Sequence, residues 1–384
     1  MTKAEKNLAR ILGQVVRKEE INWDTGVKAS ELLDCALKNS VFHIIYNSVT
    51  AADGCKENLS AYMIKEMDFV FEEANQSHAW VEFASAAEEA GIDILMLKGI
   101  QVKNYYPVPE SRNMCDVDFL YKPHQASALE KLFISLGYEK KKATVYHDGW
   151  FNPENGVTFE AHHILNSAED KEKDYYFRIW NRAANLNGKN HVFQMPAEDL
   201  YVYLLLHMRA HFKTESANLR QLTDLYVMQC YSGVREDIVK KYSDELGIGI
   251  LRESVEKTAA FLFEENSDYS ESNDVYELAD FVLGNVSFGK YSFADSKESY
   301  KSGGSKFKAF MAMIFPTADR IYKSYPFIAT HRFLLPFGYA YRLLQAFGIR
   351  RRNTAEKIRI LSGISPEAAE QGERTNKFFR KFGI

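Results

Sequence analysis

The sequence predicts an α+β protein in which a small mixed β-sheet lies between helical regions. Apolar residues recur at helical spacing before Gly91 and again after Ala197, whereas the segment between them contains short apolar or alternating runs of strand length. With 384 residues, of which 46% are hydrophobic and 9 are proline, the chain can bury a large core and lacks the composition of a disordered protein. The parts that we expect are helical residues 1–90, an α/β core over 91–195, helical residues 196–294 and a helical C-terminal region over 295–384.

The N-terminal region is expected to consist of helices. Ser30, followed by Glu31 and Leu32, is typical of a capped helix start, and Asn58–Ala90 has a long helical pattern that fits one helix or two. The first apolar stripe has helical spacing, at Leu8, Ile11, Leu12 and Val15. We therefore expect helices up to the first strand.

Strand patterns begin at Ile92. The run Ile92–Leu97 is short and apolar and is followed by Lys98 and Gly99, as in a buried strand that ends in a turn. Residues Ile100–Tyr106 fit a short helix, because the prolines that follow cannot continue it. The segment Cys115–Tyr121 alternates, which predicts a second strand.

A helix, a β-hairpin and further helices are expected after that strand. His124–Leu136 has helical spacing, and Thr144–Phe151 and Val157–Leu165 flank Asn152–Gly156, whose Asn-Gly end favours a tight turn. The polar stretch Ser296–Ser305 is the expected linker. The later helices are expected at Ala197–Lys213, Ser216–Gln229, Arg235–Leu246, Ile250–Glu265 and Asn273–Leu283.

Charge and cysteine content exclude several classes of protein. The 48 basic and 52 acidic residues give a net charge of −4, so no global field attracts nucleic acid. The basic run 350–352 could contact phosphates or end a solvated helix. The four cysteines show no metal-ligand spacing and the N-terminus is charged, which indicates a cytoplasmic protein with reduced thiols. Charged residues interrupt the apolar stretch Phe327–Ile349, so we expect no membrane span.

Two aspartates on the alternating strand are the strongest indication of chemistry. Asp116 and Asp118 are two residues apart, so on a strand they point to the same face, opposite Val117 and Phe119. Paired carboxylates repel each other unless a cation is bound, and Mg²⁺ or Mn²⁺ takes oxygen ligands. Glu160, on a strand expected beside the first, is the candidate for a third carboxylate. The alternative is a solvated strand face.

The turn after the first strand is a candidate phosphate site. Gly99, between a strand and a helix, would let a phosphate approach the backbone, and Lys98 adds a positive charge. The alternative is an ordinary turn, because Lys-Gly alone is a very weak motif.

Histidines form a second candidate group. His207 and His211 are four residues apart and therefore on one face of a helix, a spacing that can bind Zn²⁺. The zinc-protease pattern requires Glu after the first histidine, where this chain has Met208. We expect the pair either to be hydrogen-bonded within a buried helix stripe or, in the case of His207 together with His162, to line the acceptor side of a cleft.

Arg220 and Asp224 are also four residues apart on an expected helix. This spacing favours an ordinary ion pair that stabilises a helix by roughly 0.2–0.5 kcal/mol. A role in the cleft is the alternative.

Several of these residues stand in an order and spacing that resemble a known family. The sequence is similar to uncharacterised bacterial nucleotidyltransferases within the DNA-polymerase-β-like nucleotidyltransferase superfamily, over about Ile92–Tyr226. The residues that carry the resemblance are Leu95-Met-Leu-Lys-Gly99, Tyr105-Tyr-Pro107, Ser111-Arg112, Asp116-Val-Asp-Phe-Leu120, Phe159-Glu-Ala-His162, Leu205-Leu-His207 with His211, and Leu219-Arg220 with Leu222-Thr-Asp224.

The resemblance implies a polymerase-β-like core that binds Mg²⁺ or Mn²⁺ and a nucleoside triphosphate such as ATP. An acceptor hydroxyl would attack the α-phosphorus, and pyrophosphate would leave. By motif position, the expected catalytic residues and metal ligands are Asp116, Asp118 and Glu160, and Glu160 is also a candidate base. The expected nucleotide-binding residues are Lys98, Gly99, Arg112, His162 and His207.

The function that we expect is therefore transfer of a nucleoside monophosphate to a hydroxyl on a small molecule, an RNA end or a protein. Two alternatives remain open. The turn holds Gly99-Ile100 where the superfamily usually has Gly-Ser or Gly-Gly, which favours a nucleotide- or metal-binding interaction protein without turnover. A toxin-like nucleotidyltransferase is the other alternative.

Overall fold

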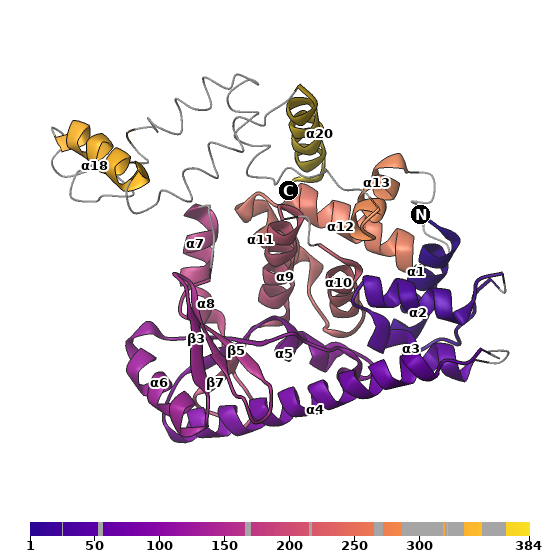
Figure 1. The fold of residues 1–384 in the computed structure, drawn as a ribbon, viewed down its shortest axis with the longest axis horizontal. Helices are drawn as coiled ribbons and strands as arrows, with labels where there is room; N and C mark the ends of the chain where they lie inside the picture. The colour runs from indigo at the N-terminus through magenta and orange to yellow at the C-terminus, as the bar shows by residue number, and fades with distance from the viewer. Residues whose placement is uncertain are drawn as a thin grey trace. The chain divides into compact units, whose positions relative to one another are not determined.

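The computed structural model describes residues 1–24, 26–52, 57–165, 170–214, 217–264, 272–285, 334–347 and 366–384, together with residues 318 and 321 (Figure 1). The chain divides into one unit of Met1–Phe212 with Ser216–Val286 and a second of Lys213–Glu215 with Ser287–Ile384. The expected linker Ser296–Ser305 and the basic run 350–352 lie outside the described residues. In the second unit the described helices are α18 (Leu335–Phe347) and α20 (Pro366–Phe382).

The N-terminal part of the first unit is helical. Thr2 and Glu5 form a capping box at the start of its first helix. Ser30 does not cap the second helix, as the sequence had suggested, because that helix already begins at Ala29. Glu57 serves these N–H groups instead, accepting hydrogen bonds from the backbone of Ala29 at 2.7 Å and of Ser30 at 3.3 Å. The helices are α1 (Lys3–Val16), α2 (Ala29–Lys38), α3 (Phe42–Ala51) and α4 (Ser60–Glu89), the last a single unbroken helix.

A mixed sheet of seven strands follows, in the order β3-β4-β5-β2-β1-β7-β6. Two of its pairs, β1 with β7 and β2 with β5, are parallel, and the other four are antiparallel. The strand that carries Asp118 is central, as the sequence predicts. The strands are β1 (Ile94–Met96), β2 (Val117–Tyr121), β3 (Glu139–Ala143), β4 (His147–Phe151), β5 (Thr158–His162), β6 (Ala184–Asn185) and β7 (Val192–Gln194).

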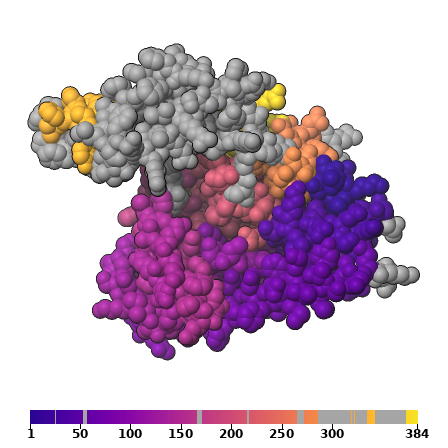
Figure 2. All heavy atoms as spheres, viewed as in Figure 1, coloured from indigo at the N-terminus to yellow at the C-terminus, as the bar shows by residue number. Residues whose placement is uncertain are grey.

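One face of the sheet packs on an aromatic core. Phe83 of α4 lies 4.8 Å from Phe119 of β2 and 5.0 Å from Phe159 of β5, measured between ring centroids. Phe133, from α6 (Ala126–Ser135), stacks on Phe83 at 4.8 Å. Figure 1 shows α4 running from the N-terminal helices along the sheet, and in Figure 2 the atoms of these regions form a continuous surface. Because strand residues alternate, this core leaves the Asp118 side chain on the opposite face.

Short helices connect the strands, and longer helices cover the second side of the unit. Gly13 of α1 lies so close to α12 that a Cβ there would be 2.0 Å from the carbonyl oxygen of Phe263, so only glycine fits. None of the helices among the described residues combines the length and apolarity needed to cross a membrane. The remaining helices are α5 (Lys98–Val102), η1 (Lys103–Tyr105), η2 (Pro109–Ser111), η3 (Pro123–Gln125), α7 (Asp170–Phe177), α8 (Ile179–Arg182), α9 (Ala197–Phe212), α10 (Leu219–Tyr231), α11 (Glu236–Leu246), α12 (Gly249–Phe263) and α13 (Asn273–Val282).

Candidate active site

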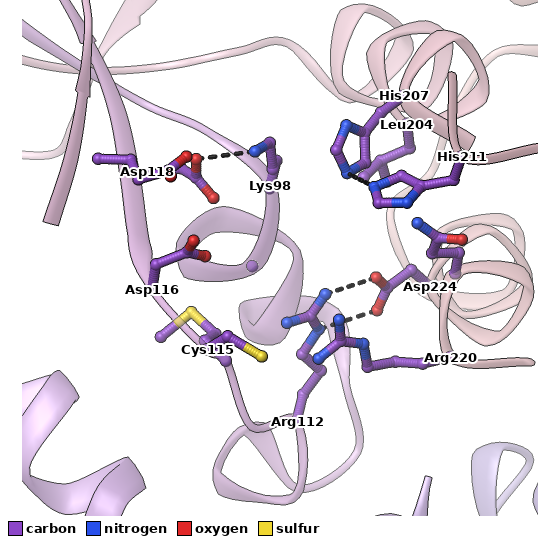
Figure 3. A pocket seen from close by; sticks show the side chains of 14 residues that line it. Lys98, Arg112, Cys115, Asp116, Asp118, Leu204, His207, His211, Arg220 and Asp224 are labelled. Atoms are coloured by element: carbon purple, nitrogen blue, oxygen red, sulfur yellow. Dashed lines mark hydrogen bonds and ion pairs between the residues drawn. The ribbon is translucent and has the colours of Figure 1, made fainter. Parts of the chain in front are cut away.

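A pocket of about 370 Å³ brings together residues that are far apart in the sequence (Figure 3). One wall comes from the turn after β1, the segment before β2, and strands β2 and β5; the other comes from α9 and α10. Figure 3 shows Asp116 and Asp118 on one side of the pocket, facing His207 and His211 on the other. The site therefore lies between the sheet and the helices that follow it.

Asp118 is buried and contacts two basic side chains. Lys98 Nζ donates a hydrogen bond to its Oδ1 at 2.8 Å, and Nε2 of His162 lies 2.9 Å from the same oxygen. Burial alone would raise the pKa of Asp118, but Lys98 and His162 outweigh burial and hold it well below its usual range. Asp118 is therefore ionised at neutral pH.

Lys98 reaches Asp118 from an unusual backbone conformation. Its φ of 42° lies in the left-handed region, which few residues other than glycine adopt. The sequence assigns Lys98 to phosphate binding, and the structure shows it at the pocket wall, paired with Asp118. Such backbone strain persists where the surrounding structure holds a side chain in place.

Asp116 lines the pocket without a partner. It makes no hydrogen bond or ion pair with any residue that the structure describes. Burial, together with the neighbouring carboxylate of Asp118, raises the pKa of Asp116 to about 6. The two aspartates therefore differ: Asp118 is already compensated by positive charge, and Asp116 is not.

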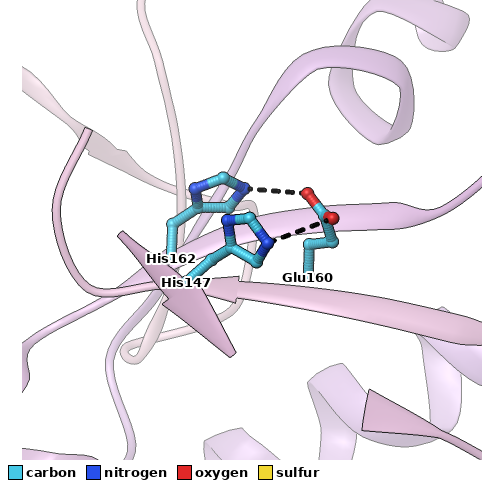
Figure 4. Close-up of side chains that lie close together, drawn as sticks. All are labelled: His147, Glu160 and His162. Carbon is cyan, nitrogen blue, oxygen red and sulfur yellow. Dashed lines mark ion pairs between the residues drawn. The ribbon is translucent and has the colours of Figure 1, made fainter. Parts of the chain in front are cut away.

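Glu160 lies beside Asp118, as the sequence predicts, because β5 runs parallel to β2 with Asp118 paired to Glu160. Its carboxylate oxygens lie 3.3 Å from Nε2 of His147 and 3.6 Å from Nε2 of His162 (Figure 4). The nearby His162 lowers the pKa of Glu160. Glu160 thus lies close to both histidines, one of which, His162, also contacts Asp118.

The expected trio of carboxylates is not the tightest group of ligand atoms. Among the residues that the structure describes, one group of three metal-binding side chains has its ligand atoms all within 4.8 Å of one another, and it consists of His147, Glu160 and His162. Asp116 and Asp118 line the same pocket as Glu160 but stand outside that group.

Arg112 forms a buried ion pair with Asp224. Its guanidinium is buried and bonds Asp224 of α10 through two nitrogens, at 3.0 and 2.6 Å, while Tyr106 donates to the same carboxylate at 2.7 Å. The expected i, i+4 partnership of Asp224 with Arg220 is therefore replaced by one with Arg112. Gly99 is packed against this group, since a Cβ there would lie 2.8 Å from Nη1 of Arg112.

Arg220, unlike Arg112, forms no ion pair with a residue that the structure describes. It lines the pocket, and its Nε is shielded from solvent without a hydrogen-bond partner in the described part of the chain. His207 and His211 lie beside it on α9, with their Nε2 atoms 3.0 Å apart. Burial, reinforced by the charge of Lys98, lowers the pKa of both histidines, so both are neutral at pH 7.

Comparison with known families decides the class of the protein. Residues 25–248, more than half of the chain, match the sequence model of a family described as uncharacterised nucleotidyltransferase. The chain belongs to this family. It is therefore a nucleotidyltransferase, an enzyme that transfers nucleotidyl groups, which confirms the resemblance at that level. No curated protein and no solved structure matches it.

The positions of two residues near this nucleotidyltransferase site were not what the sequence analysis expected first. His147 carries no motif, and only the pairing of β4 with β5, which sets His147 opposite His162, reveals it. Arg220 was expected first to pair with Asp224 along its own helix, with a role in the cleft as the alternative, and the structure shows it at the pocket. One signal in the sequence could have indicated this. The family pattern contains two arginines, Arg112 and Arg220, and either could have paired with the carboxylate of Asp224.

Proposed function

We propose that this nucleotidyltransferase transfers a nucleoside monophosphate from a nucleoside triphosphate to a hydroxyl acceptor, in a divalent-metal-dependent reaction at this pocket. The observation that carries the proposal is the placement of Asp116 and Asp118 in one pocket with Lys98 and Arg220. Carboxylates bind cations and the two basic side chains bind phosphate oxygens, so the pocket offers both halves of a metal–triphosphate site. A polymerase-β-like arrangement of the core belongs to the same proposal.

The chemistry of the aspartates supports a metal site. Asp116 is a partly buried carboxylate with no partner among the described residues, and the negative charge of Asp118 opposes its ionisation. A divalent cation such as Mg²⁺ or Mn²⁺ is the partner that removes this conflict. Asp116 and Asp118, with Glu160 on the neighbouring strand, would hold it. When bound, it would neutralise phosphate charge and polarise the phosphorus–oxygen bonds.

The sequence predicts that Arg112 binds the triphosphate together with Lys98, and the structure supports a different arginine in that role. Arg220, on α10, lines the pocket and forms no ion pair with any residue that the structure describes, whereas Arg112 is bonded to Asp224. We therefore assign Arg220, with Lys98, to the phosphate oxygens. Arg112 is a positioning residue that fixes the segment before β2 to α10, and Gly99 allows that close packing.

The transfer itself forms one phosphorus–oxygen bond and breaks another. The acceptor oxygen bonds to the α-phosphorus, the bond to pyrophosphate breaks, and the acceptor proton passes to a base. Glu160 is ionised at neutral pH and His207 is neutral, so either can take that proton. His207 lies across the pocket from the aspartates (Figure 3), and this position supports a role for it on the acceptor side.

One observation favours the second candidate, a nucleotide-binding protein without turnover. Lys98 already neutralises Asp118, and the turn that follows lacks the hydroxyl of a Gly-Ser sequence. A protein of this kind would bind a nucleoside triphosphate through Lys98 and Arg220 and would not release pyrophosphate.

An assay with labelled nucleotide separates the two. The full chain is incubated with each α-³²P nucleoside triphosphate, Mg²⁺ or Mn²⁺ and a cell extract, and labelled products and pyrophosphate are measured. Transfer that is lost in Asp116→Asn and retained in Glu139→Gln, an exposed acid on β3, supports the enzyme. Tight nucleotide binding without transfer in any extract supports the second candidate and contradicts the first.

A further inference from the structure

A cluster of two histidines and a glutamate lies at the edge of the pocket on strands β4 and β5. His147 on β4 is paired directly with His162 on β5, and Glu160 precedes His162 by two residues, so all three side chains leave the same face of the sheet. Figure 4 shows both imidazole rings directing a nitrogen toward the carboxylate of Glu160. Three adjacent positions on regular strands form a rigid frame for a ligand.

The separations within the cluster are those of a metal site. Nε2 of His147 lies 3.3 Å from Oε1 of Glu160, and Nε2 of His162 lies 3.6 Å from Oε2. Zinc bonds of about 2.0–2.1 Å place the ligand atoms of a tetrahedral site roughly 3.4 Å apart. The three ligand atoms, all within 4.8 Å of one another, can therefore close around one ion with small side-chain adjustments.

One nitrogen atom of the cluster lacks a hydrogen-bond partner among the described residues. Nε2 of His147 is shielded from solvent and makes no hydrogen bond in the described part of the chain, although an acceptor oxygen lies 3.3 Å away. A buried imidazole nitrogen is costly to leave unpaired, so most have a partner.

We propose that His147, Glu160 and His162 bind a divalent transition-metal ion, with Zn²⁺ as the ion that fits best. Two imidazoles and one carboxylate are the ligand set of zinc sites that keep a fourth position open, whereas Mg²⁺ prefers oxygen ligands alone.

The proposed zinc site differs from the Mg²⁺ or Mn²⁺ site of the proposed function and does not depend on it. The two share Glu160, but His147 belongs to the zinc site alone. Nε2 of His162, which lies 2.9 Å from Asp118 and 3.6 Å from Glu160, would have to carry no proton to bind the ion. It would also tie the hairpin strand β4 to β5 at the mouth of the pocket.

Metal titration of the purified full chain tests the site. The protein is treated with EDTA, desalted and titrated with Zn²⁺ against a chromophoric chelator, and the melting temperature and the visible spectrum with Co²⁺ are recorded. We compare wild type with His147→Gln, which keeps size and polarity, and with His124→Gln, which removes an exposed histidine elsewhere. Melting of each variant without metal shows whether it is folded.

The proposal expects one tight Zn²⁺ in wild type and in His124→Gln, with a higher melting temperature when it is bound. His147→Gln should bind at least about ten-fold more weakly and lose the Co²⁺ absorption of a four- or five-coordinate site. Equal Zn²⁺ affinity in wild type and His147→Gln would overturn the proposal.

Two further variants locate the ion if it binds elsewhere. Zn²⁺ affinity that is lost in His207→Gln but kept in His147→Gln would place the ion on the α9 histidines, and the same pattern with Asp116→Asn would place it on the aspartates. Both results contradict the zinc site and leave the proposed transferase untouched. Conversely, Zn²⁺ binding that depends on His147, together with no nucleotidyl transfer, contradicts the proposed function alone.

Discussion

Lys98 Nζ and Asp118 Oδ1 lie 2.8 Å apart in the wall of the pocket, so the cation expected to bind phosphate is bonded to the carboxylate expected to bind metal. Burial would lower the pKa of Lys98, but Asp118 raises it further than burial lowers it, and the lysine stays charged. A divalent ion at Asp118 has to displace this lysine or share the carboxylate with it. In the proposed function, the pair would couple metal binding to phosphate binding, since a triphosphate would give the released ammonium group a new partner.

Lys98→Met should separate these two effects. Methionine keeps most of the length of the side chain without its charge, so Mn²⁺ should bind the nucleotide-free protein more tightly, by roughly ten-fold or about 1.4 kcal/mol. Nucleoside triphosphate affinity should fall by a similar factor or more. Electron paramagnetic resonance of free Mn²⁺ and calorimetry with nucleotide measure the two. Lys122→Met, which removes a lysine paired with Asp93 outside the pocket, is the control and should change neither affinity.

Asp116→Asn should stabilise the metal-free protein at alkaline pH. The pKa of Asp116 is about 6 in the folded state, against 3.8 for an ordinary aspartate, so the folded state holds this proton more tightly than the unfolded state does. That contribution to stability is complete below about pH 4 and is lost as the pH rises through 6. In EDTA at pH 8 the variant should therefore unfold at a higher temperature than wild type. Its free energy of unfolding should be higher by at most about 3 kcal/mol, and this gain should disappear toward pH 4.

Asp118→Asn should have the opposite effect on stability to Asp116→Asn, so the two variants are compared. Lys98 and His162, acting against burial, lower the pKa of Asp118, so its ionised form stabilises the folded state above pH 4 and this stability is lost as the pH falls below that value. The variant should unfold below the wild-type temperature at pH 8. If both variants shifted the melting temperature in the same direction, the assignment of different charge environments to the two aspartates would be wrong.

Arg112→Met should cost far more stability than loss of a surface arginine. The variant leaves the buried carboxylate of Asp224 with only Tyr106 as a partner, and removal of one member of a buried pair costs about 3–5 kcal/mol. Urea unfolding measures the loss. Arg178→Met, which breaks an exposed pair with Asp174, should cost less than about 1 kcal/mol.

The double variant Arg112→Met/Asp224→Leu checks the cause. It removes both charges from the buried position, so it should recover much of the stability that Arg112→Met loses. A double variant as unstable as the sum of the single changes would show that Arg112 acts through packing rather than through its charge.

Arg220→Gln should weaken nucleotide binding and leave stability unchanged. One or two charge-assisted hydrogen bonds to phosphate are worth about 1.5–3 kcal/mol, so the dissociation constant for the triphosphate should rise by roughly 10- to 100-fold. Calorimetry with nucleotide and metal gives this constant. Arg235→Gln removes an exposed arginine paired with Glu198 and should have no effect. An unchanged affinity in Arg220→Gln would remove this arginine from the phosphate site.

The helical regions could be predicted closely because their apolar stripes are long. The helix expected at Ala197–Lys213 ends one residue earlier, and the long N-terminal pattern is the single helix α4. Strand β3 was missed for a physical reason: Glu139–Ala143 is exposed at every position and lies at the edge of the sheet, so it carries no apolar alternation. Strands β6 and β7 have two and three residues, too few to establish a period.

Within the site, the sequence allows prediction of those residue positions that follow from the alternation of side chains along a strand. Asp116 and Asp118 line one pocket, as their spacing suggests, although Asp116 lies just before β2, which begins at Val117. Glu160 lies beside Asp118 because β5 pairs with β2. The partnership of Arg112 with Asp224 joins residues 112 positions apart, and no local pattern fixes such a pair. The pairing of His147 with His162 depends on the register of the hairpin, which the five-residue turn sequence left undetermined.

The parallel pairing of β2 with β5 has a consequence for tolerance to insertions and deletions. Residues 122–157, which connect the two strands, can change in length without moving Glu160, provided that the pairing of Asp118 with Glu160 is kept. Deletion of a single residue inside β5 is a different matter, because it would exchange the two faces of the strand and turn either the glutamate or Phe159 the wrong way. Length variation in natural homologues and in designed variants should therefore collect in the hairpin tip and around α6, and should avoid the five residues of β5.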